Sequence, residues 1–547
     1  MILTEDYLQD LLDKTLPQVR SGDWAVVLEG SIAEGFGNSG SDIDFLLIGR
    51  SEDDLPTMPS LFFVDGRRVE VRTRSLRQVT EQFTALKADE RRVGRISEDL
   101  LNRCQRLLHS FPLRGHALVD EVKAQFPQER FRTVAADWWA HAARQSLRHA
   151  MAMLCLGEDE EAVDWARSGV VQAVKSWAAV RGETYLEPKW LSMQLDRAQR
   201  PGVRERYWEL ESGGTGMDAD ARVGACLAFA AELGVTGVPH RPERLAVERR
   251  PGVTTWQAVE RVHVVRGRSD VFAFGERAGR VWRSLVLGRP LPEALAGARA
   301  AGGSEAGPLL AQFLRLGLVR LTWKGGGTVT PALPLASPPG PLTPPPSTAR
   351  PLLSLRGAAV SGPDAVDLVP LPAARFSAAA LALVFSNMVV ENAREDLAGA
   401  VRRNQWRVAE VAAHRAAQSA LRGLFCAYGV SPLPPDPDLV RRLPLLSLPP
   451  DTRPIGPLAD ALIRVAIDSA ESAERVSLEL EEFIGVVREA AGADAFPASF
   501  DSPDTWRATL ELGHDWVRVA AHFDADLPLE EVRDLVASSG AQPHQAG

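Results

Sequence analysis

The segment that most constrains this chain is 28–48, where an apolar run leads into a Gly- and Ser-rich loop and then a second apolar run. The apolar residues 24–28 and 43–48 predict two short strands joined by that loop. Asp42 and Asp44 flank Ile43 at the start of the second strand, so strand alternation places both carboxylates on one face. Two carboxylates this close repel each other and are costly unless a cation neutralises them.

A third acid and a phosphate-compatible turn accompany this pair. Residues 68–73 alternate as a half-buried strand does, which places Glu70 on its polar face, where it would complete a cluster of three acids. Oxygen ligands of this kind suit Mg²⁺. Gly30 allows a phosphate to approach the backbone closely, and Ser31 can donate hydrogen bonds to its oxygens. Phosphoryl transfer needs this combination of positioning and charge neutralisation.

The order Gly-Ser, spacer, Asp-x-Asp and apolar-Glu-apolar resembles the polymerase-β-type nucleotidyltransferase superfamily. The nearest match is to the small antibiotic nucleotidyltransferases and to the minimal nucleotidyltransferases that pair with helical partner domains. The resemblance covers about the first hundred residues and implies a catalytic domain at 1–115. It implies that Mg²⁺ or Mn²⁺ binds Asp42, Asp44 and Glu70, that ATP or another nucleoside triphosphate contacts Gly30, Ser31 and Ser41, and that Gly35, Gly37 and Gly40 let the loop close.

Residues 116–245 carry apolar side chains at helical spacing and predict an antiparallel helical bundle. In antibiotic-modifying members of the superfamily, the helical domain contributes a carboxylate base for the acceptor hydroxyl. That resemblance makes Asp137 the candidate base, with Glu161 and Glu183 as rivals, although an acid early on a helix also stabilises the helix dipole. Lys175 is a candidate triphosphate contact, and a lysine on a solvated helix face is the alternative explanation.

Residues 255–324 change in character, with strand-like stretches followed by helix-like ones. VHVV, VFAF, the pair Val281 and Trp282, the turn at Gly288 and the closing Leu-x-x-Leu-Gly-Leu-Val resemble the winged, leader-peptide-binding domains of ribosomal peptide natural-product pathways, such as the pyrroloquinoline quinone peptide chaperone. The resemblance implies that an extended precursor or leader peptide binds at 262–323 as an added strand. Phe274 and Gly275 replace the family's usual Leu-Asn, and a plain winged packing module is the alternative.

The rest of the chain predicts a linker and a second helical unit. Residues 325–374 are rich in Gly and then Pro, which predicts an extended linker, and 375–545 are again helical in pattern. Residues 166–182 align without gaps against 413–429, with Lys175 opposite Arg422. This alignment suggests that the second helical bundle repeats the first, although two Ala-rich helices can align by composition alone. The predicted fold class is therefore multidomain α/β plus all-α.

Composition bounds the compartment and the partners. The chain has 547 residues, too many for one core, and a net charge of −9, which argues against a general grip on nucleic acid. Its four cysteines form no CxxC pair, as is typical of a reducing cytoplasm. No apolar stretch reaches transmembrane length, and acids stand where a signal peptide would carry lysines. We expect a cytoplasmic protein with no membrane partner.

The leading hypothesis is an enzyme that moves a nucleoside monophosphate from a triphosphate to an acceptor hydroxyl, on a precursor peptide if the module at 255–324 binds one. The alternatives are a transferase acting on a small antibiotic and a catalytically inactive peptide-binding scaffold. A fused toxin–antitoxin pair would need an Arg/His site in a bundle, and Arg144 with His149 and Arg407 with His414 have a suitable spacing. Such spacings are frequent in helices, and we expect both pairs to be packing or solvated side chains.

Overall fold

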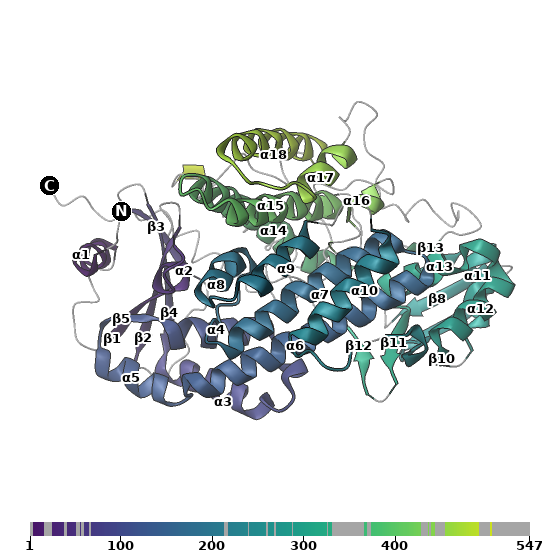
Figure 1. Ribbon diagram of the computed structural model, residues 1–547, viewed down its shortest axis with the longest axis horizontal. Helices are drawn as coiled ribbons and strands as arrows, with labels where there is room; N and C mark the ends of the chain where they lie inside the picture. The colour runs from purple at the N-terminus through teal and green to yellow at the C-terminus, as the bar shows by residue number, and fades with distance from the viewer. Residues whose placement is uncertain are drawn as a thin grey trace.

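A computed structural model describes residues 4–330, 366–368, 373–427, 436, 439–443, 455–491 and 504–505, apart from gaps at 16–23, 38–40, 51–54, 56–58, 65–66, 213–216, 239, 259–260, 267–269, 287 and 325. The chain is mixed α/β and mostly helical, as expected. Figure 1 shows a small sheet region at one end, long helices in the middle, and a second sheet-containing region at the far end. The C-terminal helices lie along one side of the long helices (Figure 1).

The N-terminal region is built on a mixed five-stranded sheet. Its strands are β1 (Trp24–Glu29), β2 (Ile43–Gly49), β3 (Ser60–Val64), β4 (Arg67–Ser75) and β5 (Phe111–Arg114), in the order β3-β4-β2-β1-β5. β2 and β4 pair in parallel, and the other neighbours pair antiparallel. The strands expected at 24–28, 43–48 and 68–73 are therefore present and adjacent; continuous apolar runs bury β1 and β2, and β4 alternates between buried and half-buried residues.

Helices cover both faces of this sheet. α1 (Glu5–Thr15) packs on one face, and α3 (Leu76–Asp89), α4 (Glu98–His109), α5 (His116–Ala124) and the start of α6 cover the other. The short helix α2 (Gly30–Ala33) follows β1 directly, and a 3-10 turn, η2 (Val93–Arg95), precedes α4. α3 begins with a capping box in which the Ser75 hydroxyl accepts from the Gln78 amide and the Gln78 side chain accepts from the Ser75 amide.

A bundle of long helices forms the middle of the molecule. It contains α6 (Gln128–Leu156), α7 (Asp159–Val180), η3 (Pro188–Trp190), α8 (Leu191–Arg197), α9 (Pro201–Glu211) and α10 (Ala219–Glu232). α6 ends at Gly157, whose φ of 84° is strained for any residue with a β-carbon. The short turn that follows makes α6 and α7 antiparallel. A β-carbon on Gly169 would lie 2.5 Å from Leu147 Cγ, so this glycine lets the two helices approach closely.

The region beyond the bundle contains two four-stranded sheets and three helices. One sheet has the order β10 (Arg289–Pro290), β6 (Leu245–Arg249), β11 (Val319–Trp323), β12 (Thr328–Val329); the other has the order β13 (Val366–Leu368), β9 (Asp270–Phe274), β8 (Arg261–Arg266), β7 (Val253–Ala258). The helices are α11 (Glu276–Ser284), α12 (Leu291–Gly302) and α13 (Ala306–Arg315), with 3-10 turns η4 (Pro242–Arg244) and η5 (Gly303–Glu305). Their apolar residues share one continuous core with the middle bundle.

Two strands lie inside the linker expected at 325–374. β12 pairs with β11, and β13 pairs antiparallel with β9, with Val366 opposite Phe274. The segment expected to be an extended linker therefore contains two short strands at its ends. The physical reason is that the edges of both sheets present unpaired backbone groups, which short segments with few other constraints can satisfy. Residues 331–365 lie outside the described residues.

The C-terminal helices are α14 (Ala373–Val401), α15 (Trp406–Ala427), α16 (Leu439–Arg442), α17 (Ile455–Ile463) and α18 (Ala470–Ala491). α14 and α15 have 29 and 22 residues, the same lengths as α6 and α7. α15 begins at Trp406, 247 residues after α7 begins at Asp159. It ends at Ala427, again 247 residues after α7 ends at Val180. The helix pairs thus agree with the alignment of 166–182 against 413–429. The helices expected beyond 505 lie outside the described residues.

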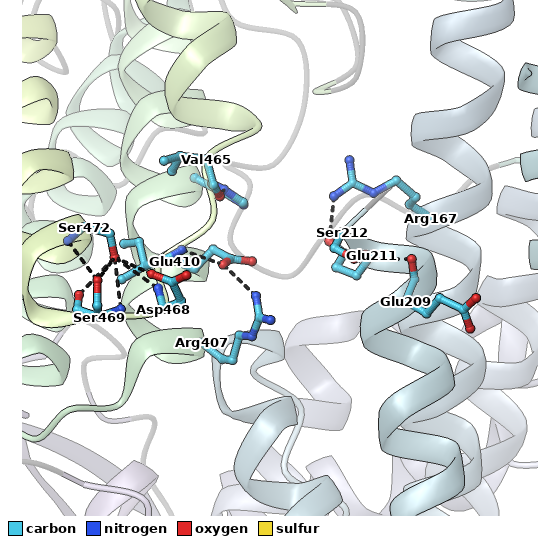
Figure 2. A network of polar contacts seen from close by, with 12 residues as sticks. Arg167, Glu209, Glu211, Ser212, Arg407, Glu410, Val465, Asp468, Ser469 and Ser472 are labelled. Carbon is cyan, nitrogen blue, oxygen red and sulfur yellow. Dashed lines mark hydrogen bonds and ion pairs between the residues drawn. The ribbon is translucent and has the colours of Figure 1, made fainter. Parts of the chain in front are cut away.

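A stacking contact joins this second unit to the middle bundle, next to the polar groups of each unit that Figure 2 shows facing one another. Arg407 of α15 donates to Glu410 at 2.9 Å, and its guanidinium stacks on Trp208 of α9 at 4.4 Å. Figure 2 shows Glu410 bonded within the second unit and, across from it, Arg167 of α7 pointing to Glu211 of α9. The two helical units therefore meet through specific contacts. Among the described helices, none combines the length and the apolar character that crossing a membrane requires.

Candidate functional site

The turn at Gly30 brings the backbone against the acid on the next strand. Glu29 lies opposite Asp44 in the β1–β2 register, and Gly30 follows with a φ of 79°. A β-carbon on Gly30 would lie 2.3 Å from Asp44 Oδ2, closer than any side chain tolerates. The left-handed backbone favours glycine here, and a larger residue would also have to displace the Asp44 carboxylate.

The three predicted acids line one cavity. Asp44 on β2 is directly opposite Glu70 on the parallel strand β4, and Asp42 immediately precedes β2. Ser31 and Ser41 line the same cavity, whose volume is about 150 Å³. The local strand pattern thus brings together Ser31, Ser41, Asp42, Asp44 and Glu70, as it predicts, with Gly30 behind Asp44.

Three arginines accompany these acids. Arg68 donates from Nε to Asp42 Oδ1 at 2.8 Å, and its Nη2 makes a second bond to Asp42. Arg106 on α4 lies 3.0 Å from Asp44 and 3.0 Å from Glu29, a buried acid that the sequence reading missed. Arg72 pairs with Glu70 and lies 3.4 Å from Glu29. Arg68, Glu70 and Arg72 alternate along β4, so strand periodicity could have identified both arginines as neighbours of the site.

Burial dominates the electrostatics of the aspartates. It raises the pKa of Asp44 to about 6, against the opposing effect of Arg106. Burial also raises the pKa of Asp42, although Arg68 opposes it. Burial has the same sense at Glu70, but the guanidiniums of Arg72, Arg106 and Arg68 outweigh it and lower the pKa of that carboxyl. The arginines therefore do not offset the whole effect of burial on the pKa values of the two aspartates. An additional positive charge would favour their ionised forms.

The raised pKa values of Asp42 and Asp44 bear on whether the site fits a divalent cation. Within the ranges that the structure describes, no three Asp, Glu, His or Cys side chains are arranged as a formed metal site. The donor chemistry does fit, because the cavity offers carboxylate and hydroxyl oxygens, beside its basic side chains, and burial disfavours the ionised forms of its two aspartates. Glu70 Oε1 is buried and ion-paired with Arg72, so a cation bound at this carboxylate would share it with that guanidinium.

The opposite wall of the cavity comes from the C-terminal unit. α14 contributes Asn392, Glu395 and Asp396, and α15 contributes Arg415. The segment after α7 adds Tyr185, Glu187 and Lys189. No local signal marks these residues in the sequence, because only the docking of α14 and α15 over the sheet brings them to the cavity.

Ion pairs close this wall against the sheet and the middle bundle. Arg68, already bound to Asp42, also lies 2.9 Å from Glu395. Lys189 pairs with Asp396 at 2.5 Å, and Arg415 lies 3.4 Å from Glu187. Burial raises the pKa of Glu395 to about 7, against the effect of Arg68. A carboxyl with a pKa in this range can accept a proton near neutral pH.

Lys175 does not face the cavity. It is fully buried, and its Nζ donates to the carbonyl oxygens of Tyr185 and Glu187, each at 2.9 Å, and to the Gln194 side chain. Its contacts hold the 185–187 segment that carries part of the cavity wall. Neither a solvated surface lysine nor a direct triphosphate contact describes this environment, because the segment after α7 folds back over the helix.

The structure also places the candidate base, Asp137, outside the cavity. It is an exposed residue of α6 on a separate surface depression that it shares with Glu90, Arg130 and Arg144. Its rival Glu161 is fully buried and pairs with Arg315, and its rival Glu183 lies 3.7 Å from Arg197. The physical reason is that α6 turns this part of its surface away from the sheet edge that carries the acids.

The two Arg/His pairs are packing groups. The His149 ring meets Trp165 edge-on at 5.2 Å and lies 3.8 Å from Glu161, while Arg144 lies beside Gly237. His414 shares a hydrogen bond of 2.9 Å with the Val465 carbonyl, and Arg407 is held by Glu410. Neither pair forms a shared polar site in the described part of the chain.

The region expected to bind a peptide has one sheet edge covered by the chain itself. β7, β8 and β9 form an antiparallel sheet followed in sequence by the three helices α11, α12 and α13. β13 adds to the β9 edge in the antiparallel sense. The opposite edge strand, β7, carries Trp256, which is 64% exposed.

Comparisons with known proteins do not assign a family or an activity to this chain. No protein-family model matches the chain, and no curated protein matches it. A crystal structure of a nucleotidyltransferase-like protein from Exiguobacterium sibiricum 255-15 is similar at 13% identity and a TM-score of 0.26, covering 42% of this chain and 73% of that one. Similarity at this level does not establish a shared family or a shared activity.

Proposed function

We propose that the cavity between the N-terminal sheet and α14 is the active site of a nucleotidyltransferase. The observation that carries the proposal is the contact between Gly30 and Asp44, with Asp42 and Glu70 lining the same cavity. A glycine turn that leaves backbone amides accessible beside clustered carboxylates suits a triphosphate accompanied by a divalent cation. Function is thus inferred from the site itself.

The residues have separable roles in this proposal. Asp42, Asp44 and Glu70 would hold Mg²⁺ or Mn²⁺, which when bound neutralises charge on the triphosphate oxygens. Ser31 and Ser41 donate hydrogen bonds to phosphate oxygens. Arg68 and Arg106 orient the aspartates and add positive charge beside the phosphates. A nucleoside triphosphate, with ATP the first to test, is the substrate.

The acceptor hydroxyl needs a base, and we assign that role to Glu395. It lines the cavity on the side opposite the acids, and its raised pKa allows it to take a proton near neutral pH. The acceptor oxygen attacks the α-phosphorus, the bond to the bridging oxygen of pyrophosphate breaks, and the acceptor's proton moves to Glu395. Asp137, the base suggested by the sequence, lies outside the cavity and drops out of this role.

The acceptor class is a second part of the proposal. A precursor peptide is the leading candidate, and the antiparallel pairing of the chain's own segment β13 with β9 is the kind of pairing that such a peptide would use. A guest peptide would compete with β13 for that edge or pair with β7. A small antibiotic remains the alternative acceptor, and an inactive peptide-binding scaffold is the alternative without catalysis.

Nucleotide turnover tests the proposal. Full-length protein would be incubated with each labelled triphosphate, Mg²⁺ or Mn²⁺, and candidate peptides or aminoglycosides, beside the double variant Asp42→Asn/Asp44→Asn. We expect an acceptor to gain one nucleoside monophosphate, with pyrophosphate release, and the double variant to lose both. Asp137→Asn is the matched control, since it removes an acid outside the cavity and is expected to retain activity. Failure of the wild-type chain to bind any triphosphate under these conditions would leave only the scaffold.

A further inference from the structure

A cluster of basic side chains lies on the middle bundle, away from the cavity. Arg148 of α6 stacks on Trp323 of β11 at 4.2 Å, and Arg244 of η4 lies 4.9 Å from the same ring. Arg144 lies one helical turn before Arg148 on α6, and both would contact a β-carbon on Gly237. The amide of Lys324 donates to the Arg244 carbonyl at 2.8 Å, which places a fourth basic residue at this corner.

Among the residues that the structure describes, no carboxylate forms an ion pair with Arg144, Arg148 or Arg244. Arg148 is only 9% exposed, and its guanidinium donates two hydrogen bonds to the neutral Gly237 carbonyl, at 3.0 and 3.2 Å. Asp137 acts on Arg144 only from a distance, and Glu243 is an exposed neighbour of Arg244.

The unfavourable placement of Arg148 beside Arg144 and Arg244 shifts the pKa of its guanidinium. Burial, followed by repulsion from Arg144 and Arg244, lowers the pKa of Arg148 to about 10. Burial, Arg144 and Arg148 also lower the pKa of His141 on the same face of α6. Elsewhere in the chain, equally buried arginines such as Arg315 and Arg422 pair with carboxylates. A nearly buried guanidinium such as Arg148, repelled by two neighbouring cations, gains free energy when an anion binds beside it.

We propose that Arg144, Arg148 and Arg244 form a binding site for a phosphate group, separate from the catalytic cavity. Guanidiniums present planar donors that match phosphate oxygens, and a dianionic phosphate with several free oxygens suits three of them better than a single carboxylate does. Trp323 is covered by Arg148 and Arg244, so it fixes the guanidiniums and is not free to stack on a base. The source of the phosphate is either a small anion or the backbone of a nucleic acid.

Binding measurements on the full-length protein at low salt with EDTA test this site, because chelation removes any cation-dependent binding at the cavity. Inorganic phosphate would be titrated by calorimetry, and a short fluorescein-labelled oligoribonucleotide by anisotropy. The variants are Arg244→Gln, which lies on the exposed side, and Arg144→Gln/Arg148→Gln. Arg280→Gln is the matched control, since Arg280 is 46% exposed, pairs with Glu276 on its own helix, donates to the Ala301 carbonyl, and lies outside the basic cluster.

We expect the wild type and Arg280→Gln to bind alike and both site variants to lose about tenfold or more in affinity. Binding of phosphate alone identifies a small anion. Preferential binding of the oligoribonucleotide, with a shallower salt dependence in Arg244→Gln, identifies a nucleic-acid backbone. Asp42→Asn should leave this binding unchanged, so the result is independent of the proposed catalysis. Equal affinity in all variants, or no binding of either probe by the wild type, overturns the proposal.

Discussion

At the scale of single residues, the site depends on positions where only one side chain fits. Gly30→Ala is expected to destabilise the fold by about 1–3 kcal/mol, because it forces a positive φ on alanine and drives a methyl group into Asp44. Nucleotide turnover should fall with it. Gly224→Ala is the control: Gly224 lies in α10 with open space around it, so alanine should be neutral or stabilise by about 0.5–1 kcal/mol. Urea unfolding of both variants measures the difference, and equal stabilities would contradict the clash.

Glu395 gives a prediction about pH. If it is the base, activity should rise as the pH passes through about 7, where its carboxyl loses its proton. Glu395→Gln should remove that limb and lower kcat by about 10²–10⁴. A folded pKa above the ordinary value means that the folded state binds the extra proton, so the contribution of Glu395 to stability is present at low pH and is lost as the pH rises toward 7.

The Gln variant should therefore gain stability relative to the wild type between pH 5 and pH 8, while losing activity. pH–rate profiles of the wild type and the Gln variant measure the change in activity, and urea unfolding curves of both proteins at the two pH values measure the change in stability. Glu474→Gln, an exposed acid on α18, should change neither. A pH–rate profile of the Gln variant that keeps its acidic limb would assign the proton transfer to another group.

At the scale of elements, the acid cluster was predictable and its far wall was not. Asp42, Asp44 and Glu70 lie on neighbouring strands whose alternation is written locally in the sequence, so pattern alone placed them together. Glu395 and Asp396 reach the cavity through the docking of α14, which no local pattern encodes. The same limit explains Lys175, where the decisive contacts come from a segment that folds back over α7.

The docking of α14 can be tested by exchanging one ion pair. Lys189 and Asp396 are 13% and 14% exposed and 2.5 Å apart. Lys189→Asp and Asp396→Lys should each destabilise by about 1–3 kcal/mol, because each leaves two like charges in a half-buried contact. The double exchange should recover part of that loss. A double-mutant cycle from urea unfolding measures the coupling, and additive single effects would show that this pair does not hold α14 in place.

At the scale of the whole molecule, the middle bundle and the region at 245–330 are one structural unit. Their apolar residues form a single core, and Arg315 of α13 donates to Glu158 at 2.7 Å and to Glu161 at 2.8 Å, at the start of α7. Glu161 is fully buried. Removing one partner of such a pair leaves an uncompensated buried charge. The sequence reading placed a domain boundary here because the residue pattern changes from helices to strands, but a change of pattern does not report which cores merge.

Arg315→Met should therefore cost about 3–5 kcal/mol near neutral pH and affect the unfolding of both parts together. Burial disfavours the ionised form of Glu161, but contact with His149 and the charge of Arg315 outweigh it and lower the pKa of this carboxyl. A lowered carboxyl pKa contributes stability above the ordinary value, and that contribution is lost as the pH falls below it. The difference between wild type and Arg315→Met should thus stay constant near neutral pH and shrink as the pH falls below the ordinary value of 4.5. We expect calorimetry to show one unfolding transition shared by the bundle and the strand region. Two transitions, of which Arg315→Met shifts only one, would mean that the two parts unfold independently.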